Sequence, residues 1–254
     1  MTSEPSAARE DTPTGGPKDG PSAKAGPGLT GSSEDGLRDR LVKAGVELVD
    51  AEGVQALSLR EIARRAGVSH GAPRRHFPTH LDLLSAIARE GFRELAERIA
   101  ASEATGTATG AGTDTGTGTV TGADTAFATG AGTDLAVHRP RARIEALARA
   151  YLDFARARGG MYELMFRHDL LESGRLGLRD TSLPLFARLA DLVALARPGA
   201  GEPATLAGAL WANLHGLAQL WRWGSLRLAT GADDLEPLLA AVLDAHLGPS
   251  EAGR

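Results

Sequence analysis

Residues 58–84 constrain the fold of this chain most strongly, because they predict two short helices separated by a tight turn. Ser58 and Glu61 have the S-x-x-E spacing of a helix N-terminal capping box. Gly67 is placed to end that helix, since glycine adopts the left-handed backbone conformation at little cost. A second short helix then extends to about Phe77. Helix, short turn and helix is the plan of a helix-turn-helix, whose second helix enters the DNA major groove.

Cationic side chains are concentrated on this stretch, although the whole chain has a formal net charge of −4. A chain with this balance needs a local basic patch to bind DNA. A merely solvated charged face would not explain why the arginines fall inside a helix-turn-helix pattern, and the capping role accounts for the acid Glu61. The candidate DNA-contacting residues are Ser58, Arg60, Arg64, Arg65, Ser69, His70, Gly71, Ala72, Arg74, Arg75, His76 and His80.

The segment from about Asp35 to Arg98 resembles the DNA-binding domain of TetR-type transcriptional repressors. The resemblance rests on Ser-Leu-Arg-Glu-Ile-Ala-Arg-Arg-Ala-Gly-Val-Ser-His-Gly-Ala-Pro and the Arg-His-Phe-Pro that follows. It implies that residues 69–77 enter the major groove. It also implies roles for single residues: phosphate contacts for Ser58, Arg60 and His80, and positions near base edges for His70, Gly71, Ala72 and Arg74. Arg74 and His80 stand where the family usually has tyrosine and lysine, and histidine is only partly charged near neutral pH.

Composition divides the chain into four parts. Residues 1–31 are rich in Pro, Gly, Ser and Thr, which predicts a disordered tail, and residues 32–101 form the DNA-binding domain. Residues 102–136 are a Thr/Gly/Ala-rich insertion with a ten-residue repeat. A calcium-binding β-helix is the alternative interpretation, but the repeat has too few apolar side chains to form a core, which favours a flexible insertion. Residues 137–248 form a C-terminal regulatory and dimerisation domain.

Helical periodicity dominates the last part, where residues 203–228 are apolar on several sides and 235–247 carry a further apolar stripe. We expect these last two helices, about 203–247, to pair with a second copy as a four-helix bundle. Arg-Ala-Tyr-Leu-Asp-Phe-Ala, Met-Tyr-Glu-Leu-Met-Phe and Trp211-x-x-x-His215-Gly216 resemble the regulatory domain of a TetR subgroup, the WHG type.

A small apolar effector is the expected ligand of that domain. The candidate lining residues are Tyr151, Phe154, Met161, Met165, Phe166, Phe186, Trp211 and His215. Each of them taken alone is better explained as plain core, and only the set indicates a cavity; His215 is best explained as a core histidine with a hydrogen-bond partner.

Other classes of site find little support in the sequence. The absence of cysteine excludes disulfides and cysteine-based zinc sites. His168, Asp169 and Glu172 could be drawn as metal ligands or an acid–base pair, but a helix end in solvent explains them better. We find no catalytic motif and expect no cofactor or metal. No apolar run reaches the roughly 18 residues of a membrane span, so a cytoplasmic protein is expected.

The sequence therefore predicts an all-α homodimer with a three-helix helix-turn-helix head and a helical-bundle body that binds ligand. Its predicted function is ligand-responsive transcriptional repression from a palindromic operator on double-stranded DNA. The alternative is a small-molecule-binding or catalytic helical protein with a vestigial DNA-binding head.

Overall fold

The computed structural model describes residues 30–109 and 128–249, which form helices joined by turns. This confirms the all-α class. The elements in chain order are α1 (Thr30–Glu52), η1 (Val54–Ala56), α2 (Leu59–Arg65), α3 (Ala72–His76), α4 (His80–Thr109), α5 (Ala128–Ala157), α6 (Gly159–Met165), α7 (His168–Ser173), η2 (Arg175–Gly177), α8 (Leu178–Ala196), α9 (Pro203–Arg222), α10 (Ser225–Thr230) and α11 (Glu236–Leu247).

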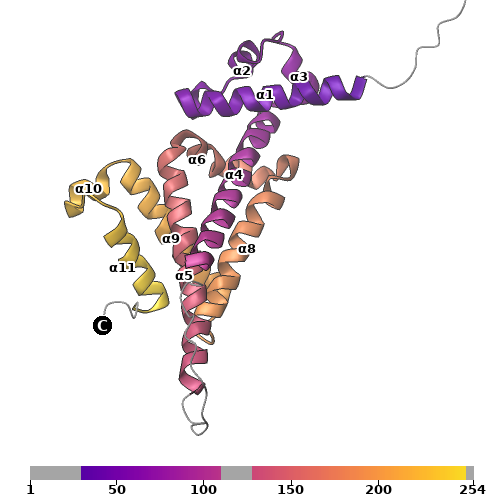
Figure 1. The fold of residues 1–254 in the computed structure, drawn as a ribbon. Coiled ribbons are helices and arrows are strands. Elements are labelled where there is room, and N and C mark those ends of the chain that lie inside the picture. The colour runs from indigo at the N-terminus through magenta and orange to yellow at the C-terminus, as the bar shows by residue number, and fades with distance from the viewer. Residues whose placement is uncertain (1–29, 110–127, 250–254) are drawn as a thin grey trace, which may run out of the picture.

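The first three helices and the start of α4 make a head, in which α1 lies across the top of α4 and carries α2 and α3 above it (Figure 1). Its core consists of side chains with no exposed surface, including Leu41, Ile62, Phe77 and Ile87. The Arg38 guanidinium lies 5.3 Å from the centre of the Phe77 ring, so the aromatic ring is covered on its solvent side by a cation.

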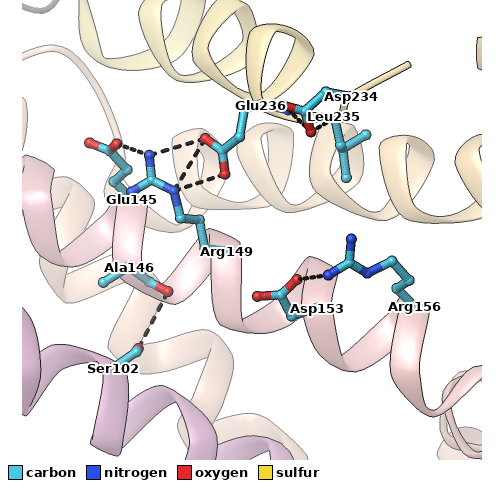
Figure 2. A network of polar contacts seen from close by, with 9 residues as sticks. All are labelled: Ser102, Glu145, Ala146, Arg149, Asp153, Arg156, Asp234, Leu235 and Glu236. Carbon is cyan, nitrogen blue, oxygen red and sulfur yellow. Dashed lines mark hydrogen bonds and ion pairs between the residues drawn. The ribbon is translucent and has the colours of Figure 1, made fainter. Parts of the chain in front are cut away.

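The body is a helical bundle in which α5 packs against α4 and α8, and α8 packs in turn against α9 (Figure 1). Polar bridges attach α11 to this bundle. Arg149 of α5 binds Glu145 on its own helix and Glu236 at the start of α11, with Nε 3.0 Å from the Glu236 carboxylate (Figure 2). At the other end of α11, Arg141 binds Asp244 at 2.6 Å. These pairs hold α11 along α5, and α11 also packs against α9.

The long helices α4 and α5 extend further than the sequence predicts. Helix α4 continues to Thr109 instead of ending near Ala101, and α5 begins at Ala128, ahead of the periodic stripe. A contact remote in sequence explains the extension of α4: Glu103 is buried and its carboxylate binds Arg188 of α8. The rest of the predicted insertion, and residues 1–29 of the predicted tail, lie outside the described residues.

Two boundaries in the C-terminal part also differ from the prediction. The apolar helix expected over 203–228 ends at Arg222, because Gly224 has a left-handed backbone with φ of 77° and separates α10 from α9. Apolar periodicity over residues 183–197 predicts a further helix, α8, but the helix begins earlier, at Leu178, and contains Pro184. The last apolar stripe is used partly within the subunit, since Leu239 and Leu243 of α11 are buried.

Ion pairs join the head to the body. Arg158, which precedes α6, binds Asp50 of α1 at 2.9 Å and also binds Glu94 of α4. Arg175 of η2 binds Asp82 in the first turn of α4 at 3.0 Å. The body is therefore tied to both α1 and α4, the two helices that carry the helix-turn-helix.

Candidate DNA-binding surface and effector cavity

The turn of the helix-turn-helix follows the local signals in the sequence. Ser58 Oγ accepts a hydrogen bond from the Glu61 backbone N–H at 3.2 Å, which caps α2. Gly67 follows the helix with φ of 68°, and the Val68 N–H donates to the Ala63 carbonyl at 3.0 Å. This closure matches that of a helix C-terminus ended by glycine. It sets the direction in which α3 leaves α2.

Helix α3 is held from one side and open on the other. Pro73, in its first turn, and Phe77, directly after it, are buried against the head. Arg74 and Arg75, which lie between them, are exposed. The preceding Ser69, His70 and Gly71 are exposed too, while Ala72 and His76 are half-buried. The structure thus brings the predicted residues of 69–76 together on the outer side of the head.

The predicted arginines differ in their pairing. Arg64 binds the Glu61 carboxylate, and Arg65 binds Glu52 at 2.5 Å. Among the residues that the structure describes, Arg60, Arg74 and Arg75 have no carboxylate partner. An arginine without a carboxylate partner offers its full charge to a phosphate, so these three are the strongest candidates for phosphate contacts among the predicted arginines.

The Glu61 carboxylate therefore has a different role from the one expected in the capping box. It does not return to the backbone N–H of Ser58, which donates to the Ala56 carbonyl at 2.8 Å instead. The hydrogen bond from Arg64 is the main reason that the pKa of the Glu61 carboxyl is lowered. The Glu61 backbone N–H is capped by Ser58, and the Glu61 side chain neutralises Arg64.

His80 combines an exposed position with an internal hydrogen bond. Its Nε2 lies 2.7 Å from the Leu57 carbonyl oxygen, which is an acceptor, so Nε2 carries the hydrogen and donates. This bond fixes the segment between η1 and α2 to the start of α4. Only Nδ1 is left for another partner.

The body contains an apolar cavity of about 320 Å³, lined from α4, α5, α7, α8 and α9. Four of the predicted ligand residues line it: Tyr151, Phe166, Phe186 and Trp211. Others were not singled out by sequence reasoning: Phe92, Leu95, Ile99, Leu147, Leu171, Ser182, Leu183, Leu185 and Leu189. Helical periodicity marks such residues as facing inward, but it gives no signal that separates a cavity wall from a filled core.

The structure places three other predicted ligand residues in the core. Phe154 is fully buried beneath the Arg98 guanidinium, which lies 5.5 Å from its ring centre. Met161 and Met165 are fully buried against α4, where a Cβ on Gly91 would lie 2.5 Å from the Met165 sulfur. These side chains hold α6 against α4.

His215 belongs to a polar cluster beside the cavity. Its Nδ1 lies 2.9 Å from the Tyr151 hydroxyl and 2.7 Å from the Tyr162 hydroxyl, and its ring stacks on Tyr162. Burial lowers the pKa of His215 and raises that of Tyr162 to about 12. Tyr162 was missed by sequence reasoning, because only the fold brings α6 to α9. The histidine is half-buried beside the core, and its partner Tyr151 lines the cavity.

The remaining candidates have simple explanations. His168 lies 3.5 Å from Glu172 at an exposed helix surface, while Asp169 binds Arg167 at 2.6 Å. The described ranges contain no cluster of three His, Cys, Asp or Glu side chains arranged for a metal ion. Within those same ranges, the helices are too short or too polar to cross a membrane.

Comparison with known families matches both parts of the chain. Residues 41–87 match the bacterial regulatory proteins of the tetR family, and residues 144–246 match the tetracyclin repressor-like C-terminal domain. A curated relative, the HTH-type transcriptional regulator SrpR of Pseudomonas putida, is 38% identical over 58 residues. That match covers 23% of this chain and 27% of SrpR, so the chain spans about a quarter of that relative's length.

Solved structures resemble the chain over most of its length. A protein of unknown function from Rhodococcus sp. RHA1 is 25% identical with a TM-score of 0.60, covering 83% of this chain and 93% of its own. The multidrug binding protein EbrR, solved with imidazole, is 23% identical with a TM-score of 0.50, covering 85% and 97% respectively. The arrangement of head and body is thus shared with known proteins.

Proposed function

This chain belongs to the TetR family of transcriptional regulators, and we propose that it is a repressor that releases its operator when a small ligand binds the body. The main support for the proposal comes from the exposed arginines on the outer side of α3. Arg74 and Arg75 project there without carboxylate partners among the described residues, while Pro73 and Phe77 hold the helix from behind. A short helix with this arrangement is suited to the major groove.

We infer a homodimer from the surface of the last helices. On α9, Ala204, Gly208, Ala212 and Gly216 recur every four residues, and a Cβ on either glycine would meet nothing within 4 Å. Exposed alanines are also present on α11, at Ala240, Ala241 and Ala245. Small side chains allow helices of two subunits to approach closely in a four-helix bundle. A two-fold axis there would make the operator a palindrome.

The proposed response to ligand uses α4 as the connection. Phe92, Leu95 and Ile99 of this helix line the cavity, and its first turns belong to the head. A ligand that fits one position of α4 better than another shifts the population between a DNA-binding and a released state. The protein would act in the cytoplasm, on the nucleoid, where operator DNA is found.

A binding experiment tests this function against its alternative. Fluorescence anisotropy with labelled DNA from upstream of the protein's own gene should give an affinity at least about 1,000-fold tighter than random DNA at the same salt concentration. Footprinting should show two half-sites about one helical turn apart. Equal affinity for both DNAs would favour the alternative, a small-molecule-binding or catalytic protein with a vestigial head.

A further inference from the structure

No carboxylate, ammonium, guanidinium or imidazole group lines the cavity. Of its lining residues, Tyr151 and Ser182 carry hydroxyl groups and Trp211 an indole N–H, and the others are hydrocarbon. A charged ligand would lose its hydration in this cavity without meeting a counter-ion, which opposes its binding strongly. The wall therefore selects an uncharged molecule.

Aromatic rings make up one side of the wall. The ring centre of Trp211 lies 6.1 Å from that of Phe166 and 6.3 Å from that of Phe186, and Phe166 lies 6.1 Å from Tyr151. These rings are tilted or edge-to-face, so both faces and edges are presented around the space. Aromatic groups pack favourably in either geometry, so a flat aromatic ligand gains contacts that a flexible chain does not.

The polar cluster next to the wall leaves one hydrogen-bonding position at Tyr151, whose hydroxyl also accepts a hydrogen bond from the Trp211 indole N–H. The Tyr151 hydroxyl lies 2.9 Å from both the Tyr162 hydroxyl and His215 Nδ1, and Tyr162 lies 2.7 Å from the same nitrogen. Burial raises the pKa of Tyr151 well above its usual value and lowers that of His215, so the cluster is neutral near pH 7. The number of hydrogens in it is therefore fixed, and only their positions vary.

Each tautomer of His215 assigns those hydrogens differently. When Nδ1 is unprotonated, Tyr162 donates to it and Tyr151 donates to Tyr162, so the Tyr151 oxygen can accept from a ligand. When Nδ1 carries the hydrogen, it donates to Tyr162, Tyr162 donates to Tyr151, and Tyr151 can donate to a ligand. A hydroxyl group both donates and accepts, so a ligand hydroxyl fits Tyr151 in either case.

We propose that the cavity binds an uncharged aromatic molecule with one hydroxyl group, a phenol in chemical class, and that this hydroxyl meets Tyr151. The inference rests on the proposed effector role of the cavity and names the class of effector. Tyr151 is the specificity-determining residue. His215 and Tyr162 are positioning residues, since they act on the ligand through Tyr151.

Three matched probes test the ligand class by calorimetric titration of the whole protein at pH 7. 2-Naphthol is uncharged at this pH because phenols titrate near pH 10, naphthalene lacks the hydroxyl, and 2-naphthoate is ionised. We expect 2-naphthol to bind about fivefold to tenfold more tightly than naphthalene, the gain of one hydrogen bond. We expect 2-naphthoate to bind at least tenfold more weakly than 2-naphthol. Equal binding of 2-naphthoate, or no binding of any probe, would overturn the proposal.

Two variants test the role of Tyr151. Tyr151→Phe should reduce 2-naphthol affinity to the level of naphthalene and leave naphthalene within about twofold, whereas Ser182→Ala, the control at the other hydroxyl, should keep the preference. Equal weakening of both probes by Tyr151→Phe, or loss of the preference in Ser182→Ala, would contradict the assignment. If Tyr151→Phe does not fold, the ranking of probes on the wild-type protein decides alone. The titrations contain no DNA, so they test ligand binding separately from operator binding. Either one can fail while the other succeeds.

Discussion

Gly160 of α6 lies directly against the main chain of α1, where a Cβ on this glycine would be 2.3 Å from the Val49 carbonyl oxygen. No side-chain Cβ tolerates such an approach, and a backbone oxygen inside a helix cannot move aside on its own. The glycine therefore lets the body touch the last turns of α1, next to the ion pair between Arg158 and Asp50.

Replacing Gly160 with alanine should separate the body from the head. We expect Gly160→Ala to lower the free energy of unfolding by about 1–3 kcal/mol, the usual cost of overpacking, and to change operator affinity. Urea unfolding and fluorescence anisotropy measure the two effects. Gly159→Ala is the matched control, because its Cβ would meet only the mobile end of Arg222 at 3.0 Å. Equal losses in both variants would show that the Val49 contact is not the cause.

The pairing of the arginines predicts unequal roles in DNA binding. Arg74→Ala should lower the log–log slope of affinity against salt by about one, as expected for the loss of one phosphate contact. Arg64→Ala should change the slope less, because Glu61 already neutralises this side chain. Arg156→Ala, on α5 and paired with Asp153, is the control for net charge. Anisotropy titrations at several salt concentrations measure the slopes, and an unchanged slope for Arg74→Ala would exclude it from the interface.

The parts of the fold that the sequence predicts well are those with local causes. The Ser58 cap and the Gly67 turn depend on residues within five positions of each other. Thr79 and Asp82 have a spacing that likewise predicts a capping box, and each side chain binds the other residue's backbone N–H. These local hydrogen bonds form as the sequence predicts because tertiary contacts do not compete for the same groups.

The features that the sequence does not predict depend on residues far apart in the chain. Helix α4 continues beyond Ala101 because the Glu103 carboxylate binds Arg188, 85 positions away in the sequence. Periodicity likewise marks Leu95 and Met161 alike as inward-facing, yet Leu95 lines the cavity and Met161 fills the core. Whether an inward side chain meets a neighbour or an empty space is decided by the helices around it. A single helical stripe does not contain that information.

Asp82 makes a stability contribution that depends on pH. Its carboxylate accepts hydrogen bonds from the Thr79 hydroxyl at 2.7 Å and from Arg175 at 3.0 Å, and these bonds lower its pKa in that order of importance. A folded pKa below the unfolded value means that the contribution is complete above about pH 4, and is lost as pH falls through the folded pKa. Asp82→Asn should therefore cost roughly 1–2 kcal/mol at pH 7.

The pH dependence separates this effect from a general loss of packing. The difference in unfolding free energy between wild type and Asp82→Asn should shrink as pH is lowered from 5 towards 3, since protonation removes the same charge from the wild type. Urea unfolding at several pH values measures it. Asp39→Asn, at an exposed carboxylate of α1, should change stability little at any of them. A difference that stays constant with pH would assign the loss to packing.

The proposed subunit interface predicts which charges break the dimer. Leu239 is 2% exposed within one subunit, so Leu239→Arg should unfold the body and says nothing about assembly. Ala212 is exposed at the middle of the small-residue surface of α9. Ala212→Arg should leave the fold intact but place a desolvated charge at the two-fold axis, giving a folded monomer. This monomer should bind the operator far more weakly, because a single head makes only half of the contacts.

Ala187→Arg, on the exposed side of α8, is the control and should remain dimeric. Size-exclusion chromatography with light scattering measures the number of subunits of each protein at micromolar concentration. A dimeric Ala212→Arg or a monomeric wild type would rule out this interface.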